Sequence, residues 1–246
     1  MNDPGSPSAN SAPGPDFAAF GPVEVRPLSR MQTLVAAAMQ KSWTTIPHVS
    51  HFEEADLTAV EILRADQAEQ GGRKKSLLAF FIKAAVAALK QFPQVNASLD
   101  AGGKALVLKQ YYNIGFAVDV PGGLLVPVIR DADKKSLADI AQEVIDLALL
   151  ARTKGLPMTK MSGGTFTISS LGSIGGLGFT PIINAPELAI LGMGRAYRRP
   201  FEAPQGIQWK TMLPFSMSYD HRAINGSLAG DFCAAFAAAL GHPDKA

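Results

Sequence analysis

The sequence has little of the chemistry that marks disulfide-stabilised or metal-binding proteins. Cys233 is the single cysteine among 246 residues, which excludes a disulfide framework, and its apolar helical surroundings are typical of a small buried residue. His48 and His51 are three residues apart in a stretch that we expect to be extended. They would face opposite sides of a strand, so no metal site is indicated.

Charge of one sign and long apolar runs are also scarce. The formal net charge is +2 with 18% charged residues, so the chain lacks the basic field on which nucleic-acid binding depends. Residues 1–25 contain no arginine and no apolar run long enough for a signal peptide or a membrane span. We therefore expect a soluble, intracellular protein with neither nucleic acid nor a membrane as its partner.

Composition divides the chain into two parts. Residues 1–16 are rich in Pro, Ala, Ser and Gly, which is typical of a linker and predicts that another module precedes it in the natural protein. Residues 17–246 can bury a substantial core because 47% of the chain is hydrophobic, and we expect them to form one domain.

Apolar periodicity predicts helices and strands in alternation along the domain. Capping residues and a 3.6-residue period predict helices over residues 29–43, 76–91, 136–155 and 228–240. A further helix is predicted to begin at residue 56 or 58 and to extend beyond residue 64. The helix over 76–91 is apolar nearly all round and should be buried. Strands are predicted over residues 46–53, 105–111, 113–120, 124–129, 165–171, 188–198 and 207–219, with a turn at 121–123 and a connection at 200–206. The fold class is therefore α/β (α+β) with a mixed sheet.

The stretch from Asp220 to Gly226 concentrates an imidazole, two charges, an amide and a turn-forming glycine after a predicted strand. A histidine can take and give a proton near neutrality, so His221 is a candidate general base. The alternative is a structural histidine that caps a turn. Ser169 and Ser170 end another strand and lead into a glycine-rich loop. Their hydroxyls could donate to an oxyanion, although they could equally be ordinary strand residues.

Two other kinds of site are disfavoured. The sequence contains no Gly-x-Ser-x-Gly elbow, which argues against covalent serine catalysis. The loop over residues 172–178 resembles a dinucleotide fingerprint, but Phe179-Thr180-Pro181 follows it where a helix should begin.

Four spaced motifs together resemble one family. They are Asp220-His221-Arg222-x-x-Asn225-Gly226, residues 166–172, residues 46–49 and residues 115–119. The chain thereby resembles, over residues 17–240, the catalytic domain of dihydrolipoamide acyltransferases, the core components of 2-oxo acid dehydrogenase complexes. The resemblance implies a chloramphenicol acetyltransferase-like mixed β-sheet with flanking helices, and a homotrimer with active sites between subunits.

The resemblance also implies an activity and partners. Residues 46–50 are most like the acetyl-transferring or branched-chain members, and the bacterial pyruvate dehydrogenase acetyltransferases are the nearest type. The expected reaction moves an acetyl group between dihydrolipoamide and coenzyme A in the bacterial cytoplasm. Lipoyl and subunit-binding modules usually precede such domains through Ala/Pro-rich linkers, so the lipoyl domain and other components of the complex are the expected partners.

Family roles can be carried over to individual residues. By resemblance, His221 deprotonates the attacking thiol, Ser169 donates a hydrogen bond to the tetrahedral oxyanion, and Asn225 orients the surroundings of the histidine. His221 and Ser169 would come from different subunits, so an isolated monomer should be inactive.

For coenzyme A, the resemblance implies four further residues. Arg64 would contact a phosphate. Phe179 and Leu191 would line or gate the pantetheine tunnel, with core packing as the alternative for both. Asp119 is a lesser candidate for a polar role.

The sequence departs from the family pattern in three places. Asn225 stands where many members have aspartate, although asparagine occurs among bacterial acetyl-transferring members. Asp231 stands where those members commonly have arginine, which could alter a subunit contact. Residues 241–246 lack the apolar anchor that joins trimers in cubic or dodecahedral cores, so we expect isolated trimers.

Two other functions stay open at this point. One is a catalytically silent structural or binding core subunit, which the presence of both His221 and Ser169 argues against. The other is a free-standing coenzyme A-dependent acyltransferase, which the linker-like start disfavours.

Overall fold

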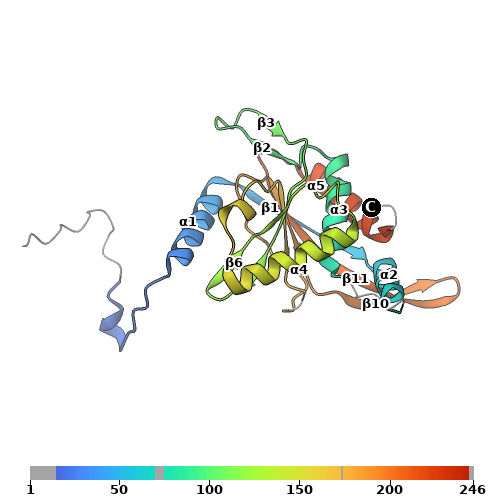
Figure 1. The fold of residues 1–246 in the computed structure, drawn as a ribbon, viewed down its shortest axis with the longest axis horizontal. Helices are drawn as coiled ribbons and strands as arrows, with labels where there is room; N and C mark the ends of the chain where they lie inside the picture. The colour runs from blue at the N-terminus through green and yellow to red at the C-terminus, as the bar shows by residue number, and fades with distance from the viewer. Residues whose placement is uncertain (1–14, 70–74, 173, 244–246) are drawn as a thin grey trace, which may run out of the picture.

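The centre of the fold is a seven-stranded mixed sheet with the order β1-β11-β9-β8-β4-β7, in which β10 pairs with β11 (Figure 1). A computed structural model describes residues 15–69, 75–172 and 174–243. The elements are η1 (Phe17–Phe20), α1 (Arg30–Thr45), β1 (His48–Asp56), α2 (Thr58–Glu69), α3 (Leu77–Gln91), β2 (Ala97–Leu99), β3 (Leu106–Leu108), β4 (Ile114–Phe116), β5 (Val118–Val120), β6 (Gly123–Leu125), β7 (Val128–Ile129), α4 (Leu137–Lys154), η2 (Met158–Lys160), β8 (Phe166–Ser170), β9 (Ala189–Met193), β10 (Tyr197–Ala203), β11 (Gly206–Asp220) and α5 (Gly226–Gly241).

The sheet joins the first and last strands of the chain. β1 runs antiparallel to β11 over its whole length, from His48 opposite Asp220 to Asp56 opposite Met212. β9 pairs with the other side of β11 in antiparallel fashion, and β8 then runs parallel to both β9 and β4. The C-terminal end of β11 therefore lies at the N-terminal ends of β8 and β9.

Helix ends follow the predicted capping chemistry. Ser29 and Ser136 each close a capping box, with Gln32 and Asp139 as the respective partners. α4 ends at Gly155, which takes a φ of 74° that a residue with a side chain would rarely adopt. These helices begin at the residues that the sequence predicts.

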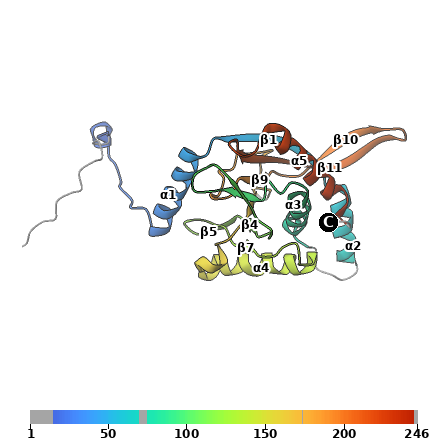
Figure 2. The same ribbon diagram turned by 90° about the horizontal axis from the view of Figure 1, so that it is seen from above.

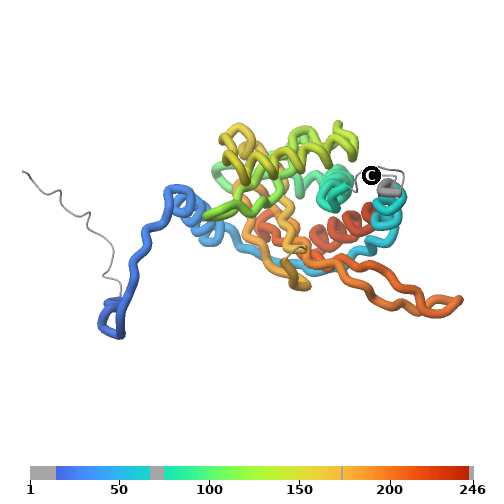
Figure 3. The backbone as a smooth tube through the Cα atoms, turned by 60° about the horizontal axis from the view of Figure 1, so that its bottom comes forward, coloured from blue at the N-terminus to red at the C-terminus, as the bar shows by residue number. Residues whose placement is uncertain are grey.

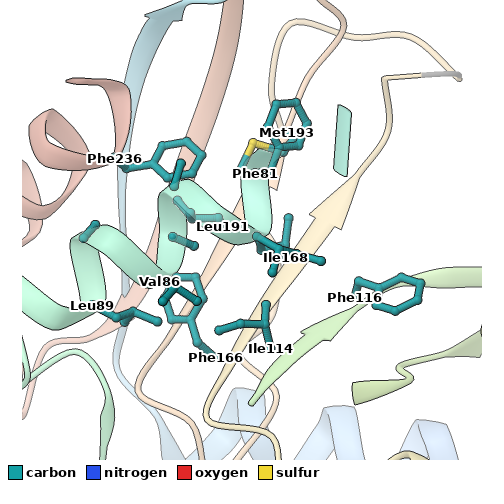
Figure 4. Packing of buried hydrophobic residues seen from close by; sticks show 14 of the residues in the cluster. Phe81, Val86, Leu89, Ile114, Phe116, Phe166, Ile168, Leu191, Met193 and Phe236 are labelled. Atoms are coloured by element: carbon teal, nitrogen blue, oxygen red, sulfur yellow. The ribbon is translucent and has the colours of Figure 1, made fainter. Parts of the chain in front are cut away.

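The predicted burial of α3 is confirmed. Its side chains pack against β4, β8, β9 and α5 in the main hydrophobic cluster, which includes Phe81, Phe166, Leu191 and Phe236 (Figure 4). Cys233 of α5 is fully buried in the same cluster. Burial raises the pKa of its thiol to about 12, so the cysteine acts as a packing residue.

Several predictions about the strands need correction, and the run predicted as one strand over 113–120 divides into β4 and β5. The apolar run 124–129 divides into β6 and β7, because Pro127 cannot donate to a ladder and instead accepts a hydrogen bond from Phe116 N at 3.0 Å. The strand expected over 188–198 ends at Met193. The connection expected at 200–206 is mostly β10, an edge strand in which Pro200 needs no ladder partner. The short strand β2 was not predicted.

Two segments extend from the body at opposite ends. The residues before α1 lead away from the domain, and the β10–β11 hairpin projects on the other side (Figures 2 and 3). The apolar face predicted for α1 is therefore largely uncovered in this chain, with Leu34 63% exposed. Most of the predicted linker and the end of the C-terminal tail lie outside the described residues.

Candidate active site

The corner between β11 and α5 presents His221 on a restrained backbone. Asp220 is 1% exposed, and Arg222 clamps it through Nε to Oδ1 at 2.9 Å and Nη2 to Oδ2 at 2.6 Å. The His221 amide donates to the Pro47 carbonyl at 3.1 Å. The residues on both sides of the histidine are therefore held, while the imidazole is exposed and lies 5.9 Å from the Tyr219 ring. A base presented in this way can meet a substrate without moving the chain.

Asn225 stands one turn further on as the N-cap of α5. Its Oδ1 accepts a hydrogen bond from Leu228 N at 2.9 Å, which satisfies one of the free amides of the first turn. The side chain is exposed at the same corner as His221. Since the oxygen is used by the helix, the amide nitrogen is the group that it can offer to a ligand.

Ser169 lies in a row of residues that crosses three strands. It is in register with Gly192 on β9, which is in register with Ser216 on β11. The neighbouring residue Ile168 points into the helix-covered core, so Ser169 faces the opposite side of the sheet. Among the described residues, no hydrogen-bond partner engages its half-buried hydroxyl. This hydroxyl is therefore available to donate to an oxyanion.

Phe179 lies over the same row. A Cβ at Gly192 would meet Cζ of Phe179 at 3.0 Å, so the ring occupies the space directly beside Ser169. Its backbone carbonyl accepts a hydrogen bond from Ser216 Oγ at 2.5 Å. The structure thus brings together Phe179 and Ser169, two of the residues that the sequence places in the site.

Two adjoining hollows near the start of α3 connect Arg64 to the end of β8. One has a volume of about 360 Å³ and is lined by Arg64, Lys75, Ser76 and Gln142 among others. The second, also about 360 Å³, shares Ser76 and is lined by Ser170. Both are within the size range of ligand pockets. The Arg64 guanidinium already bonds Glu61 at 2.6 Å and the Lys75 carbonyl at 2.8 Å, which orients it at the wall of the first hollow.

Two predicted binding residues do not join this face. Leu191 is 0% exposed in the core cluster, on the helix-covered side of the sheet (Figure 4). Core packing, the alternative that the sequence left open, describes its place in this chain, and its role as a tunnel wall stays a prediction. Asp119 is exposed on the β5–β6 hairpin opposite Leu124. It lies in β5, beyond the end of β4, and its role stays a prediction.

His221 and Ser169 are far apart within one chain. Ser169 is in the row of Ser216, two strands away from it, and His221 follows Ser216 by five positions, directly after the end of β11. At about 3.3 Å per residue and about 4.8 Å per strand, the two residues are separated by about 19 Å. No small thioester can contact both. A site that uses both residues therefore needs a second copy of the chain.

The structure adds residues whose roles the sequence did not reveal. Asp220 and Arg222 belong to the histidine motif, and their clamp could have been anticipated from it. Glu187 gives no such signal. It is 3% exposed, its Oε2 has no hydrogen-bond partner among the described residues, and burial raises its pKa to about 8. With that pKa the carboxyl is neutral at pH 7. Glu187 lies near Thr167, which stands two residues before Ser169 on the same face of the sheet.

The remaining histidines do not form a metal centre. His48 is held by two backbone groups, with Nδ1 2.8 Å from Ile46 O and Nε2 accepting from Ile183 N at 3.0 Å. In the part of the chain that the structure describes, no cluster of His, Cys, Asp and Glu could hold a metal ion. Nor is any helix there both long and apolar enough to span a membrane.

The mixed sheet and the helices packed against it have the chloramphenicol acetyltransferase-like fold. A chloramphenicol acetyltransferase is similar with a TM-score of 0.57 at 16% identity, covering 82% of this chain and 94% of that one, which shows the shared fold. The chain belongs to the family of 2-oxoacid dehydrogenase acyltransferases (catalytic domain), whose model matches residues 20–246. The predicted family and fold are thereby confirmed.

Individual relatives are closely similar. The acetyltransferase component of the pyruvate dehydrogenase complex from Pseudomonas aeruginosa is 50% identical over 223 residues, which are 89% of this chain and 41% of that protein. Two solved structures reach a TM-score of 0.90 at 45% identity, covering 96% of this chain and 99% of theirs. One is the dihydrolipoamide acetyltransferase of Azotobacter vinelandii, and the other is the cubic core of a pyruvate dehydrogenase multienzyme complex. The chain spans about a third to a half of the length of the curated relatives it matches.

Proposed function

We propose that this chain is the catalytic unit of an acetyltransferase that exchanges an acetyl group between dihydrolipoamide and coenzyme A in a pyruvate dehydrogenase complex. One observation carries the proposal. The Azotobacter vinelandii enzyme was studied for the role of a serine, a histidine and an asparagine in its catalytic mechanism, and these three stand at the same separations as Ser169, His221 and Asn225. The geometry of this chain suits all three residues to those roles.

The reaction follows from what each residue can do. The His221 imidazole accepts the proton of the coenzyme A thiol, and the thiolate attacks the thioester carbonyl of acetyl-dihydrolipoamide. The hydroxyl of Ser169 donates to the oxyanion that forms. When the tetrahedral adduct collapses, the carbon–sulfur bond to dihydrolipoamide breaks and His221 returns the proton to the leaving sulfur. A positioned base contributes about 10² to 10⁴ in rate and an oxyanion donor on the order of 3 kcal/mol.

The hollows at the start of α3 suit the nucleotide end of coenzyme A. Arg64, which is paired with Glu61, and Lys75 bring positive charge to the wall of the first hollow, and Ser76, the N-cap of α3, lines both hollows. The second hollow leads toward Ser170, one residue from the proposed oxyanion donor. We propose that the phosphates bind at Arg64 and that the pantetheine chain runs toward the row of Ser169.

The separation of about 19 Å between His221 and Ser169 requires a heterologous contact between copies. A closed ring of three copies would place His221 of each beside Ser169 of the next, and we propose this homotrimer as the active form. Lipoyl groups would reach the site from a separate domain, as the family resemblance implies.

The test uses the purified chain with acetyl-coenzyme A and dihydrolipoamide, and detects S-acetyldihydrolipoamide by mass spectrometry. The wild type should form product, and His221→Ala should lower the rate by about 10² to 10⁴. His242→Ala, an exposed histidine after α5, is the matched control and should retain the rate. If the wild type formed no product, the alternative of a catalytically silent structural core subunit would be the better interpretation. Equal rates for His221→Ala and the wild type would refute the mechanism.

A further inference from the structure

Phe179 is attached to the sheet at few points. It follows a glycine-rich loop in which Gly175 and Gly176 take φ values of 122° and 91°, which favour glycine. Gly176 O accepts from Arg195 N at 2.9 Å, and Ile183 is held by Ser42 and His48. Among the described residues between those two points, the bond from Ser216 to the Phe179 carbonyl is the hydrogen bond that ties the segment to the sheet.

Ser216 and Gly192 hold Phe179 in place, one by a hydrogen bond to its carbonyl and the other by leaving space for its ring. Ser216 is 0% exposed, and its Oγ lies 2.5 Å from the Phe179 carbonyl oxygen. A Cβ at Gly192 would lie 2.8 Å from Ser216 Oγ and 3.0 Å from the Phe179 ring. Any side chain at position 192 would displace one or both, so the glycine leaves the space that the ring fills.

The Phe179 ring and Gly192 lie next to the proposed oxyanion donor, Ser169. Gly192 and Ser169 are register partners on neighbouring parallel strands, which lie about 4.8 Å apart. An acyl carbon whose oxygen accepts a hydrogen bond from Ser169 lies within about one strand spacing of the ring. The alkyl part of the acyl group must therefore share the space over this row with Phe179.

We propose that Ser216 and Gly192 are positioning residues which fix Phe179 beside Ser169, and that the fixed ring restricts the transferred group to a short, unbranched acyl chain. This inference rests on the proposed function and names the substrate class of the same site. Acetyl is the group expected to fit best, and a branched isobutyryl group would meet a ring whose backbone Ser216 holds in place.

Ser218 offers a matched control for the anchor. It lies two residues along β11 on the same face, is 1% exposed, and makes one side-chain bond of 3.1 Å, to Ser50. Ser216→Ala and Ser218→Ala therefore each remove one buried hydroxyl and one hydrogen bond from the same strand. They differ in that only the first hydroxyl holds Phe179.

The experiment compares kcat/KM for acetyl-coenzyme A and isobutyryl-coenzyme A with dihydrolipoamide as acceptor. The wild type should prefer acetyl by at least about tenfold. Ser216→Ala should reduce this preference roughly fivefold, because one hydrogen bond restrains the ring, while Ser218→Ala should leave it unchanged. Phe179→Leu, which keeps an apolar side chain at a half-buried position, should reduce the preference at least as much.

The outcomes separate the two proposals. A wild type that transfers neither group would overturn the proposed function. A wild type that transfers acetyl, together with unchanged preference in Ser216→Ala, would overturn this inference alone. Should Ser216→Ala fail to fold, an unchanged preference in Phe179→Leu has the same force. A loss of preference as large in Ser218→Ala would show that general loosening of β11, and not the anchor, sets the selectivity.

Discussion

Activity should be recovered by mixing two inactive variants of this chain. His221→Ala removes the base and Ser169→Ala removes the oxyanion donor, and each alone should lower the rate by at least about 10². The two residues are about 19 Å apart in one copy, so each proposed site takes its histidine from one copy and its serine from the next. A mixed assembly can therefore contain a site in which both residues are intact.

The expected recovery can be worked out for a closed ring of three copies. In every ring that contains both variants, one junction joins an intact His221 to an intact Ser169, and the other two junctions each lack at least one. Mixed trimers should thus show about one third of the wild-type rate per ring. A random mixture that includes the unmixed rings should show about one quarter.

Co-expression with two different affinity tags, followed by purification on both, isolates the mixed assemblies for the transfer assay. His221→Ala paired with the double variant His221→Ala/Ser169→Ala is the control and should show no recovery. If the mixed assemblies of the two single variants were as inactive as this control, the division of the site between copies would be refuted.

Two further predictions concern stability. The pKa of Glu187 is raised from 4.5 to about 8 in the folded chain, so the unfolded chain releases this proton first and the wild type loses stability as the pH rises from 4.5 to 8. Over that window the free energy of unfolding of Glu187→Gln should rise relative to that of the wild type by on the order of 4 kcal/mol. Urea unfolding at a series of pH values measures this difference, and a difference that stayed constant with pH would contradict a neutral carboxyl. Asn225→Ala should lower the free energy of unfolding by about 1 kcal/mol through loss of the α5 cap, whereas Asn225→Asp keeps the acceptor and should not; equal losses in urea titrations would argue against the cap.

Local chemistry made much of this fold predictable. The capping boxes at Ser29 and Ser136 each depend on residues three positions apart, so the sequence alone indicates where α1 and α4 begin. The His221 corner could be found for the same reason, since base, clamp and cap lie within six residues. The motif resemblance then supplied a role for Ser169.

What could not be predicted depends on strand register. Whether Leu191 lines a tunnel or packs in the core is decided by which face of β9 it occupies, and a shift of one residue would reverse the answer. Gly192, its neighbour, carries no signal in the sequence, and its importance follows only from the ring and the hydroxyl that converge on it. Glu187 likewise becomes unusual only when the fold buries it.

The pairing of β1 with β11 has a consequence for synthesis of the chain. His48 lies opposite Asp220, so the two strands are joined only after nearly the whole domain has left the ribosome. Until then β1 is unpaired and the sheet is limited to β9, β8, β4 and β7, and contacts of such long sequence separation form slowly. The step that closes the sheet also brings His221 against Pro47. A nascent chain that stops before β11 therefore has neither a complete sheet nor a placed base, and it presents additional unpaired strand edges.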